Sequence, residues 1–275
     1  MTTQHEKAVR FRALHEEAGA FVIANAWDAG SARLLAGMGF PAIATSSGAS
    51  ANVLGRRDGQ VRRDEALAMA RAIALATELP VSADLENGFG HAPADAAETI
   101  RLAAEAGLVG GSIEDATGEA DRPLYDLEHA TARVAAAVEA ARSLVLPFTL
   151  TARAENFFRG NSDLADTIAR LQAYERAGAD VLFAPCLPDL DAVRAVCQAV
   201  RKPVNFMVGI PGRSFTVAEL QAAGVRRISL ATSLYRAAMT GLLDAAREIR
   251  AHGTFTYVDR ATPSQELLRI MDAAG

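Results

Sequence analysis

Short apolar runs of strand type alternate with longer alanine-rich segments, and this alternation repeats eight times along the chain. The longer segments place apolar residues at i, i+3 and i+4, as in EALAMARAIALATE at 65–78, which is typical of a helix with one buried face. Glycines at 107, 178 and 224 end such segments, where glycine relieves the strain of a left-handed residue. Strands are expected at 21–27, 41–47, 81–86, 110–115, 148–155, 181–186, 204–208 and 227–232.

Eight strand–helix units in 275 residues predict an α/β fold, a closed (β/α)8 TIM barrel. An open doubly wound sheet is the alternative, but the first strand-to-helix turn lacks the GxGxxG pattern typical of that fold. We therefore interpret residues 1–275 as a single barrel domain. A long helix is expected at 234–253 and a short final helix within 262–275. Because a closed barrel does not need this C-terminal helical extension, 234–275, we expect it to pack on another subunit.

The charge pattern argues against nucleic acid and membrane as partners. The net charge is −5 and no basic block occurs, so the arginine pairs at 56–57, 62–63 and 226–227 are interpreted as solvated surface. The only cysteines, Cys186 and Cys197, do not have the spacing of a metal or redox motif. No apolar segment reaches the length of a membrane span, and the N-terminal segment has no apolar signal core, so a cytoplasmic protein is expected.

Acidic residues gather where the third, fourth and fifth strands should end. The stretch VSADLENGFG at 81–90 places Asp84 and Glu86 on one face of a strand, Glu114 ends the next strand, and Arg153 lies near the end of the fifth. In a barrel of this type the chemistry is carried by these C-terminal strand ends. Carboxylates this close together repel one another, so a cation or a shared proton should accompany them.

A cluster of carboxylates without histidine or cysteine suits a hard ion, Mg²⁺ or alternatively Mn²⁺. Because magnesium retains several waters, we expect Asp84 to be the direct ligand and Glu86 and Glu114 to hold metal-bound waters. The alternative is structural: Asp84, Glu86, Glu114 and Arg153 could form an ion-pair network without a metal.

A magnesium ion with open positions can bind a 2-oxo acid and stabilise its enolate. Arg153 could pair with the same oxygens, and the backbone N–H groups of Ser47 and Gly48 could hold the substrate carboxylate; a plain turn is the alternative for that stretch. A Schiff-base aldolase would need a lysine at the barrel mouth. The only lysines, Lys7 and Lys202, lie elsewhere in the expected fold, which favours the enolate route.

Four segments together resemble the isocitrate lyase/phosphoenolpyruvate mutase superfamily over about residues 10–245: TSSGASANVLGRRDG at 45–59, SADLENGFG at 82–90, SIED at 112–115 and TARAE at 151–155. The resemblance implies a (β/α)8 barrel whose last helix is swapped onto a partner in a homodimer or homotetramer. It also implies Mg²⁺ and small 2-oxo acids of the pyruvate, oxaloacetate, glyoxylate or 2-oxoglutarate type as ligands.

The resemblance implies a role for each matching residue. Asp84 matches the metal ligand, Glu86 stands where many members have a second aspartate, and Glu114 matches an acid that holds metal-bound waters. Arg153 matches the arginine that pairs with the substrate oxyanion, and Asp58 an acid near the metal-bound waters. Further positions matching substrate-binding residues are Trp27, Ser46, Ser47 and Gly48, and, more loosely, Asn205.

One segment departs from the family pattern. Lyases that cleave isocitrate or methylisocitrate resemble one another in a lysine–cysteine–glycine–histidine loop after the fourth strand, whereas 116–130 contains neither cysteine nor lysine. The group that would protonate the enolate is therefore open among Tyr235, Asp58 and water. We expect 116–130 to be a mobile gate over the site, with an ordinary surface loop as the alternative.

Three functions are consistent with this pattern. The first is a Mg²⁺-dependent carbon–carbon lyase acting on a small 2-oxo (di)carboxylic acid or its aldol-type adduct, like an oxaloacetate decarboxylase or a methylisocitrate lyase. The second is phosphonopyruvate hydrolase or phosphoenolpyruvate mutase chemistry, for which segment 116–130 offers only Arg122 and His129 as basic groups. The third is a barrel that binds 2-oxo acids without catalysis.

Overall fold

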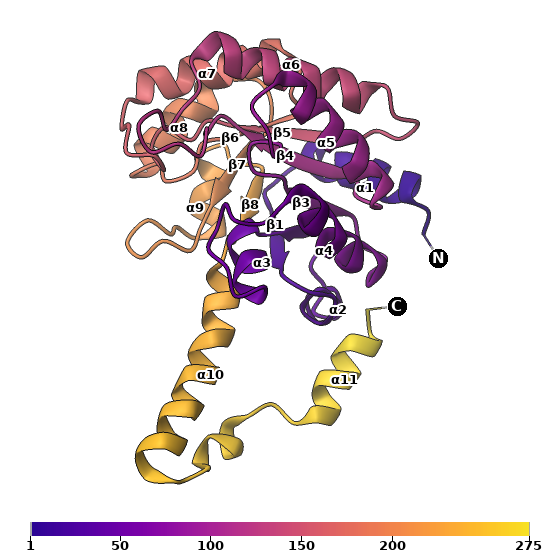
Figure 1. The fold of residues 1–275 in the computed structure, drawn as a ribbon, viewed down its shortest axis with the longest axis vertical. Helices are drawn as coiled ribbons and strands as arrows, with labels where there is room; N and C mark the ends of the chain where they lie inside the picture. Colours follow the sequence, from indigo (N-terminus) through magenta and orange to yellow (C-terminus); the bar gives the residue numbers. More distant parts are fainter. Residues whose placement is uncertain (1, 275) are drawn as a thin grey trace.

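The strands of the computed structural model, which describes residues 2–274, form a closed parallel barrel in the order β1 to β8 (Figure 1). This confirms the (β/α)8 prediction, although most strands are shorter than expected because their ends bend into loops. The strands are β1 (Phe21–Ala26), β2 (Ile43–Thr45), β3 (Val81–Asp84), β4 (Gly110–Glu114), β5 (Thr149–Arg153), β6 (Val181–Phe183), β7 (Val204–Met207) and β8 (Arg227–Ser229).

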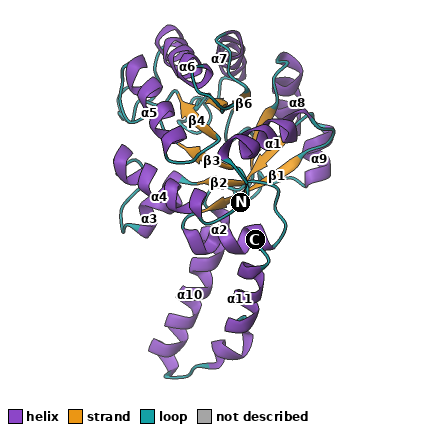
Figure 2. Ribbon diagram, turned by 90° about the vertical axis from the view of Figure 1, so that its right-hand side faces the viewer, coloured by secondary structure: helices purple, strands orange, loops and turns teal. Residues whose placement is uncertain are grey.

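Helices α1 to α9 lie around the barrel, and the C-terminal helices project away from it (Figure 2). They are α1 (Gln4–Glu16), α2 (Ala29–Gly37), α3 (Ser47–Val53), α4 (Arg63–Leu75), α5 (Pro93–Glu105), α6 (Leu127–Arg142), α7 (Leu164–Arg176), α8 (Leu190–Ala199), α9 (Val217–Ala222), α10 (Ser233–His252), the 3₁₀ helix η1 (Thr256–Arg260) and α11 (Ser264–Asp272). Within residues 2–274, no helix is both long enough and apolar enough to cross a bilayer.

The barrel core lies between strands and helices, and its interior departs from the usual pattern. Alanines of α5 and α6 let these helices pack closely, and Phe11 of α1 is fully buried in the core. TIM-barrel interiors are usually filled by branched apolar side chains. Here β3, β4 and β5 instead contribute Ser82, Ser112 and Thr151, which are buried but small and polar. This leaves room for polar groups inside the barrel.

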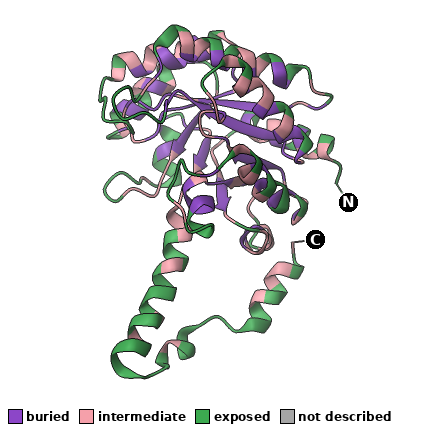
Figure 3. Cartoon of the chain, viewed as in Figure 1, coloured by how far each residue is buried: buried purple, intermediate pink, exposed green. Residues whose placement is uncertain are grey.

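The C-terminal extension forms an arm that leaves the barrel. Helix α10 has no buried residue and exposes Leu242 and Leu243, and η1 and α11 lead back to α2 (Figures 1 and 3). Arg33 on α2 donates to the Met271 carbonyl at 3.0 Å. Gly37 permits this return, because a Cβ at that position would lie 1.8 Å from the Ile270 carbonyl oxygen. The packing of this arm on a partner subunit remains a prediction.

Candidate active site

A cavity of about 1050 Å³ opens at the C-terminal ends of the strands and reaches down into the barrel. It brings together most of the expected site residues: Ser46, Ser47, Gly48, Asp58, Asp84, Glu86, Glu114, Arg153 and Asn205. Trp27 is not among the described residues that line it. Its ring instead packs edge-on against Tyr235, with 5.4 Å between the ring centroids.

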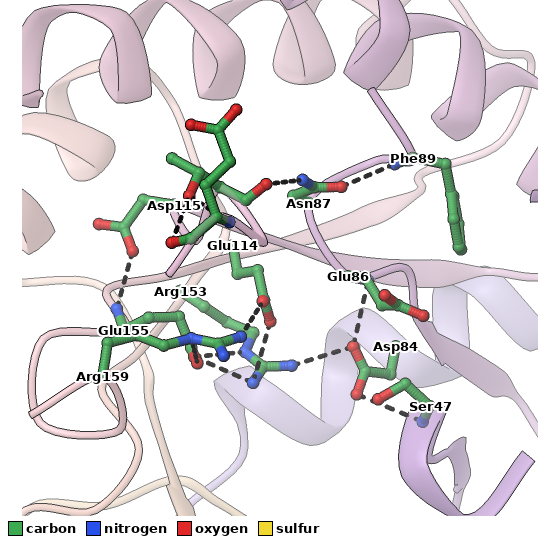
Figure 4. A network of polar contacts seen from close by, with 12 residues as sticks. Ser47, Asp84, Glu86, Asn87, Phe89, Glu114, Asp115, Arg153, Glu155 and Arg159 are labelled. Atoms are coloured by element: carbon green, nitrogen blue, oxygen red, sulfur yellow. Dashed lines mark hydrogen bonds and ion pairs between the residues drawn. The ribbon is translucent and has the colours of Figure 1, made fainter. Parts of the chain in front are cut away.

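Arg153 is the centre of the charge network at the cavity mouth (Figure 4). Its guanidinium nitrogens lie 2.9 Å from Asp84 Oδ1, 3.2 Å from Glu114 Oε2 and 2.9 Å from Glu155 Oε1. Burial by itself would lower the pKa of Arg153, but the charges of Glu155, Glu114 and Asp84 raise that pKa well above its usual value. The guanidinium is therefore permanently charged, and its ion pairs with Asp84, Glu114 and Glu155 hold it in place.

Glu114 lies on the arginine side of this network. Its other carboxylate oxygen contacts Arg159 Nη2 at 3.2 Å, so both oxygens are engaged by guanidinium groups. Burial and the charge of Glu155 raise the pKa of Glu114, while Arg153 opposes that rise. In this arrangement the Glu114 carboxylate restrains the two arginines, and its expected role in holding a metal-bound water remains a proposal.

On the other side of Arg153, three carboxyl groups crowd together. Asp84 Oδ1 accepts the Glu86 N–H at 3.3 Å, and Asp84 Oδ2 accepts only a long hydrogen bond of 3.5 Å from the Ser47 N–H. Burial, then the charges of Asp84 and Asp58, raise the pKa of Glu86 to about 8. Burial and the charge of Asp84 likewise raise the pKa of Asp58. Asp84 is paired with Arg153, but among residues 2–274 neither Glu86 nor Asp58 forms an ion pair.

This crowding is what a hydrated divalent cation would relieve. Among residues 2–274, no three His, Cys, Asp or Glu side chains form a ready-made ligand group; Asp58, Asp84 and Glu86 lie near one another without converging on one point, and Arg153 separates Asp84 from Glu114. Magnesium needs only one or two direct carboxylates and completes its shell with water. Asp84, flanked by Asp58 and Glu86, therefore fits such an ion as an oxygen-only donor set.

The Ser46–Gly48 stretch, where a turn was expected, begins helix α3. Ser46 caps the helix by accepting the Ala49 N–H at 3.4 Å, so the Ser47 N–H is free to face Asp84. Gly48 is closely packed: a Cβ there would lie 3.2 Å from Thr232 Cγ2 and 3.4 Å from Asp58 Oδ2. The absent side chain keeps the backbone next to the carboxyl group.

Comparison with known proteins decides the family. A sequence model of the phosphoenolpyruvate phosphomutase family matches residues 11–250. The chain belongs to this family. That places it in the isocitrate lyase/phosphoenolpyruvate mutase superfamily, as the sequence motifs predicted.

Relatives of this family member differ in activity. A crystal structure of a proposed lyase/mutase from Burkholderia cenocepacia J2315 is 54% identical with a TM-score of 0.95, and the alignment covers 97% of this chain and 95% of that one. The 2-methylisocitrate lyase of Escherichia coli (strain K12) is 29% identical, with 91% of this chain and 86% of the relative covered. The oxaloacetate decarboxylase of Marinomonas sp. (strain MWYL1) is 28% identical, with 94% and 92% covered.

The segment in which this family member lacks the lysine–cysteine motif borders the cavity. Ala116 and Leu124 form an antiparallel bridge, and the Thr117 N–H donates to the Pro123 carbonyl at 3.1 Å. Ala116, Thr117 and Gly118 line the cavity. Helix α6 begins at Leu127, so the last four residues of the expected gate 116–130 are helical. Its mobility remains a prediction.

Four charged residues of the site either were not among the expected site residues or were misplaced; Glu155 was expected to face inward with Arg153 but was given no role. Glu155 is fully buried, and the alternation that singled out Arg153 also points to it. Arg159 and Arg236 come from loop and helix positions with no periodic signal. The expectation that the pair at 226–227 is solvated surface is wrong for Arg227, which is 5% exposed. Arg227 begins β8 and shares the inward face with Ser229, and that alternation was the available signal.

Proposed function

We propose that this protein is a Mg²⁺-dependent carbon–carbon lyase acting on a small 2-oxo (di)carboxylic acid or its aldol-type adduct. The observation that carries the proposal is the placement of Arg153 against Asp84, with the crowded carboxyl groups of Asp58 and Glu86 on the other side of Asp84. Relatives named 2-methylisocitrate lyase and oxaloacetate decarboxylase support this reaction class.

Asp84, with Asp58 and Glu86 beside it, would hold the ion. When bound, magnesium supplies a Lewis acid that stabilises negative charge developing on the keto oxygen of the substrate. Arg153 faces the same position and contributes a fixed positive charge without reorganisation. Glu114 and Glu155 hold the guanidinium at 3.2 Å and 2.9 Å, so its donors are already oriented when the substrate enters.

The start of α3 would orient the substrate. The backbone N–H groups of Ser47 and Gly48 lie at the cavity wall next to Asp84 and could bind the carboxylate beside the keto group. Arg236, from the first turn of α10, lines the same cavity and adds positive charge at the rim.

Asp58 is the better candidate for the proton donor that replaces the missing cysteine. Asp58 lines the cavity and lies beside Asp84, and in the metal-free protein burial and the charge of Asp84 raise its pKa. Tyr235 packs against Trp27 and is not among the described lining residues. Water remains the alternative donor.

The deciding experiment is turnover with and without metal. Incubation with oxaloacetate, and separately with 2-methylisocitrate, should release pyruvate in the presence of Mg²⁺; EDTA should stop the release and added Mg²⁺ should restore it. Pyruvate release that is indifferent to EDTA would contradict the metal-dependent mechanism. Calorimetric binding of these acids with no turnover of any of them would instead favour a non-catalytic binding protein.

A second candidate is phosphonopyruvate hydrolase or phosphoenolpyruvate mutase chemistry. The structure favours it through basic groups that segment 116–130 did not offer: Arg62, Arg63, Arg159 and Arg236 all line the cavity and could hold a phosphoryl group. The description of the matching family model agrees with this chemistry. Phosphate release from phosphonopyruvate, or formation of phosphonopyruvate from phosphoenolpyruvate, would distinguish this candidate from a carbon–carbon lyase.

A further inference from the structure

A second arginine lines the same cavity as Arg153, at the level of the buried strand residues. The side chain of Arg227 enters the barrel from the start of β8 and is 5% exposed. Its Nε donates to Asn205 Oδ1 at 2.8 Å and its Nη2 donates to Thr151 Oγ1 at 3.0 Å. Its Nη1 lies 3.5 Å from His15 Nε2. The guanidinium is thus fixed in position by groups from three separate elements.

All of these partners are electrically neutral. The Nδ1 atom of His15 lies 2.8 Å from the Phe11 carbonyl, which can only accept, so Nδ1 carries the proton and Nε2 is left as an acceptor. Burial and the charge of Arg227 lower the pKa of His15 to about 3, which keeps the ring uncharged. Across residues 2–274, no Asp or Glu forms an ion pair with Arg227, in contrast to the three that surround Arg153. A buried charge without an opposite charge is unfavourable.

Further hydroxyl groups line the same cavity as this guanidinium. The hydroxyls of Ser82 and Ser112 line the cavity and make no side-chain hydrogen bond to any residue in the described range 2–274. The Ser229 hydroxyl accepts from Asn205 Nδ2 at 3.0 Å, which leaves its own proton available. We call the part lined by Ser82, Ser112, Arg227 and Ser229 the lower cavity; among the described residues these four present hydroxyl and guanidinium groups and no carboxylate, the reverse of the mouth.

The pKa of Arg227 is consistent with a buried guanidinium that has no negative charge beside it. Burial, and then the charge of Arg153, lower the pKa of Arg227 to about 9. The acids of the mouth do not relieve this, because Glu114 and Glu155 are engaged by Arg153 and Arg159. An anion placed between the hydroxyls and the guanidinium would oppose the burial penalty on Arg227 and its repulsion by Arg153.

We propose that the lower cavity is a binding subsite for a small anionic group, centred on Arg227. Two sources share this chemistry: the second carboxylate of a dicarboxylic 2-oxo acid whose keto-acid end lies at Arg153, and a free small anion such as a halide. Thr151, which holds Arg227, is two residues before Arg153 on β5, or about 7 Å along the strand. A short dicarboxylate can span that distance. Only the first source rests on the proposed function.

One arm of the test uses bromide alone. Crystals of the wild-type protein soaked in bromide, without 2-oxo acid or Mg²⁺, should show anomalous density beside the Arg227 guanidinium, and crystals of Arg227→Gln should not. This arm does not depend on any enzymatic activity, so it can succeed even if the proposed lyase reaction is wrong.

The other arm measures a ligand preference by calorimetry with Mg²⁺ present. Two matched pairs differ only by a carboxylate in place of a methyl group: oxaloacetate against 2-oxobutyrate, and 2-oxoglutarate against 2-oxopentanoate. If the distal carboxylate binds Arg227, the wild type prefers at least one dicarboxylate by roughly tenfold or more, as for a charge-assisted hydrogen bond. Arg227→Gln should bring that ratio close to one, and Arg227→Lys should retain part of it.

A second variant covers the case in which Arg227→Gln does not fold. Ser82→Val keeps the guanidinium but fills the lower cavity and removes a donor, so it should lower the same preference and weaken the bromide density. Two results together would overturn the subsite. The first is the absence of bromide density at Arg227 in the wild type. The second is a dicarboxylate preference that does not change in Arg227→Gln, or in Ser82→Val if Arg227→Gln does not fold. Failure of the proposed function is recognised separately, as absence of Mg²⁺-dependent turnover.

Discussion

The guanidinium of Arg153 on β5 donates from Nη1 to Asp84 Oδ1 on β3 at 2.9 Å, across the intervening strand β4. This ion pair divides the acids of the cavity mouth into two groups. Glu114 and Glu155 neutralise Arg153, whereas Asp58 and Glu86 crowd Asp84 from the other side. Asp84 therefore belongs to both groups. Replacing it should affect metal binding without unfolding the barrel.

Asp84→Ala should abolish Mg²⁺-dependent activity and leave the barrel folded. The substitution removes the central metal ligand and the ion pair with Arg153. It also removes a charge that, together with burial, raises the pKa values of Glu86 and Asp58, so part of the lost folding stability is offset. Activity assays, Mg²⁺ calorimetry and circular dichroism measure the three effects. Asp191→Asn, at an exposed acid of α8 that is paired with Arg194 and is not among the residues lining the cavity, is the matched control and should retain activity. Intact activity in Asp84→Ala would show that the metal assignment is wrong.

Arg153→Met should weaken both catalysis and folding. Loss of an oriented donor to the developing oxyanion lowers the rate by an amount equivalent to roughly 3–4 kcal/mol. Denaturant titration at pH 8 should also show a loss of about 3–5 kcal/mol in unfolding free energy, because Glu114 and Glu155 stay buried without their partner.

Arg159→Met is the control for that stability effect. Its guanidinium is more exposed, and it shares Glu114 with Arg153, so its removal should lower the unfolding free energy by less than about 1 kcal/mol. Equal losses in the two variants would mean that Arg153 is not the centre of the network.

The metal-free protein should lose stability as the pH rises from 6.5 to 8. The folded-state pKa of Glu86 is about 8, above its unfolded value of 4.5, so its contribution is complete below 4.5 and is lost as the pH rises through 8. His15 acts in the opposite sense, because its folded pKa of about 3 lies below 6.5 and its contribution is lost only as the pH falls below 6.5.

Thermal unfolding across this window measures the effect. Glu86→Gln should flatten the decline, and saturating Mg²⁺ should flatten it in the wild type, because a bound cation favours the charged carboxylates. A decline of equal slope in Glu86→Gln would assign the pH dependence to other groups, such as Asp58 or Glu114, whose pKa values are also raised.

The C-terminal arm should hold subunits together. Leu242 on α10 and Leu268 on α11 are 60% and 59% exposed, and no residue of either helix is buried in the single chain. Light scattering should give the mass of a homodimer or homotetramer, and Leu242→Glu with Leu268→Glu should reduce it. Arg250→Gln, at an exposed polar position of α10, should leave the mass unchanged. A wild-type mass of one chain would rule out this role.

Segment 116–130 should become protected when a ligand binds. Residues 118–123 are exposed beside the cavity, and the bridge between Ala116 and Leu124 closes the segment at its base. Hydrogen exchange in this segment should slow when oxaloacetate and Mg²⁺ are added, as expected of a gate that excludes water. Unchanged exchange, with binding confirmed by calorimetry, would identify it as an ordinary surface loop.

Local pattern was sufficient to predict the barrel and one half of its site. Repeated strand–helix units with glycine at the helix ends determine the (β/α)8 fold, because each unit buries one face and requires the next. Strand alternation in 82–86 and 151–155 determined that Asp84 and Arg153 face inward. The family motifs lie in the same segments, so fold, family and the inward placement of Asp84 and Arg153 could be inferred before the structure was known.

The tertiary structure decided how charges on different strands are paired. Alternation tells which face a side chain occupies, but not which groups meet across a barrel, so the pairing of Glu114 with two arginines and the placement of Trp27 outside the cavity were not predictable. Arg227 shows this most clearly: its pair in the sequence is typical of solvated surface, yet the guanidinium lies among neutral groups inside the barrel. The physical reason is that burial and Coulomb energy depend on distances between segments far apart in the chain, which only the closed barrel sets.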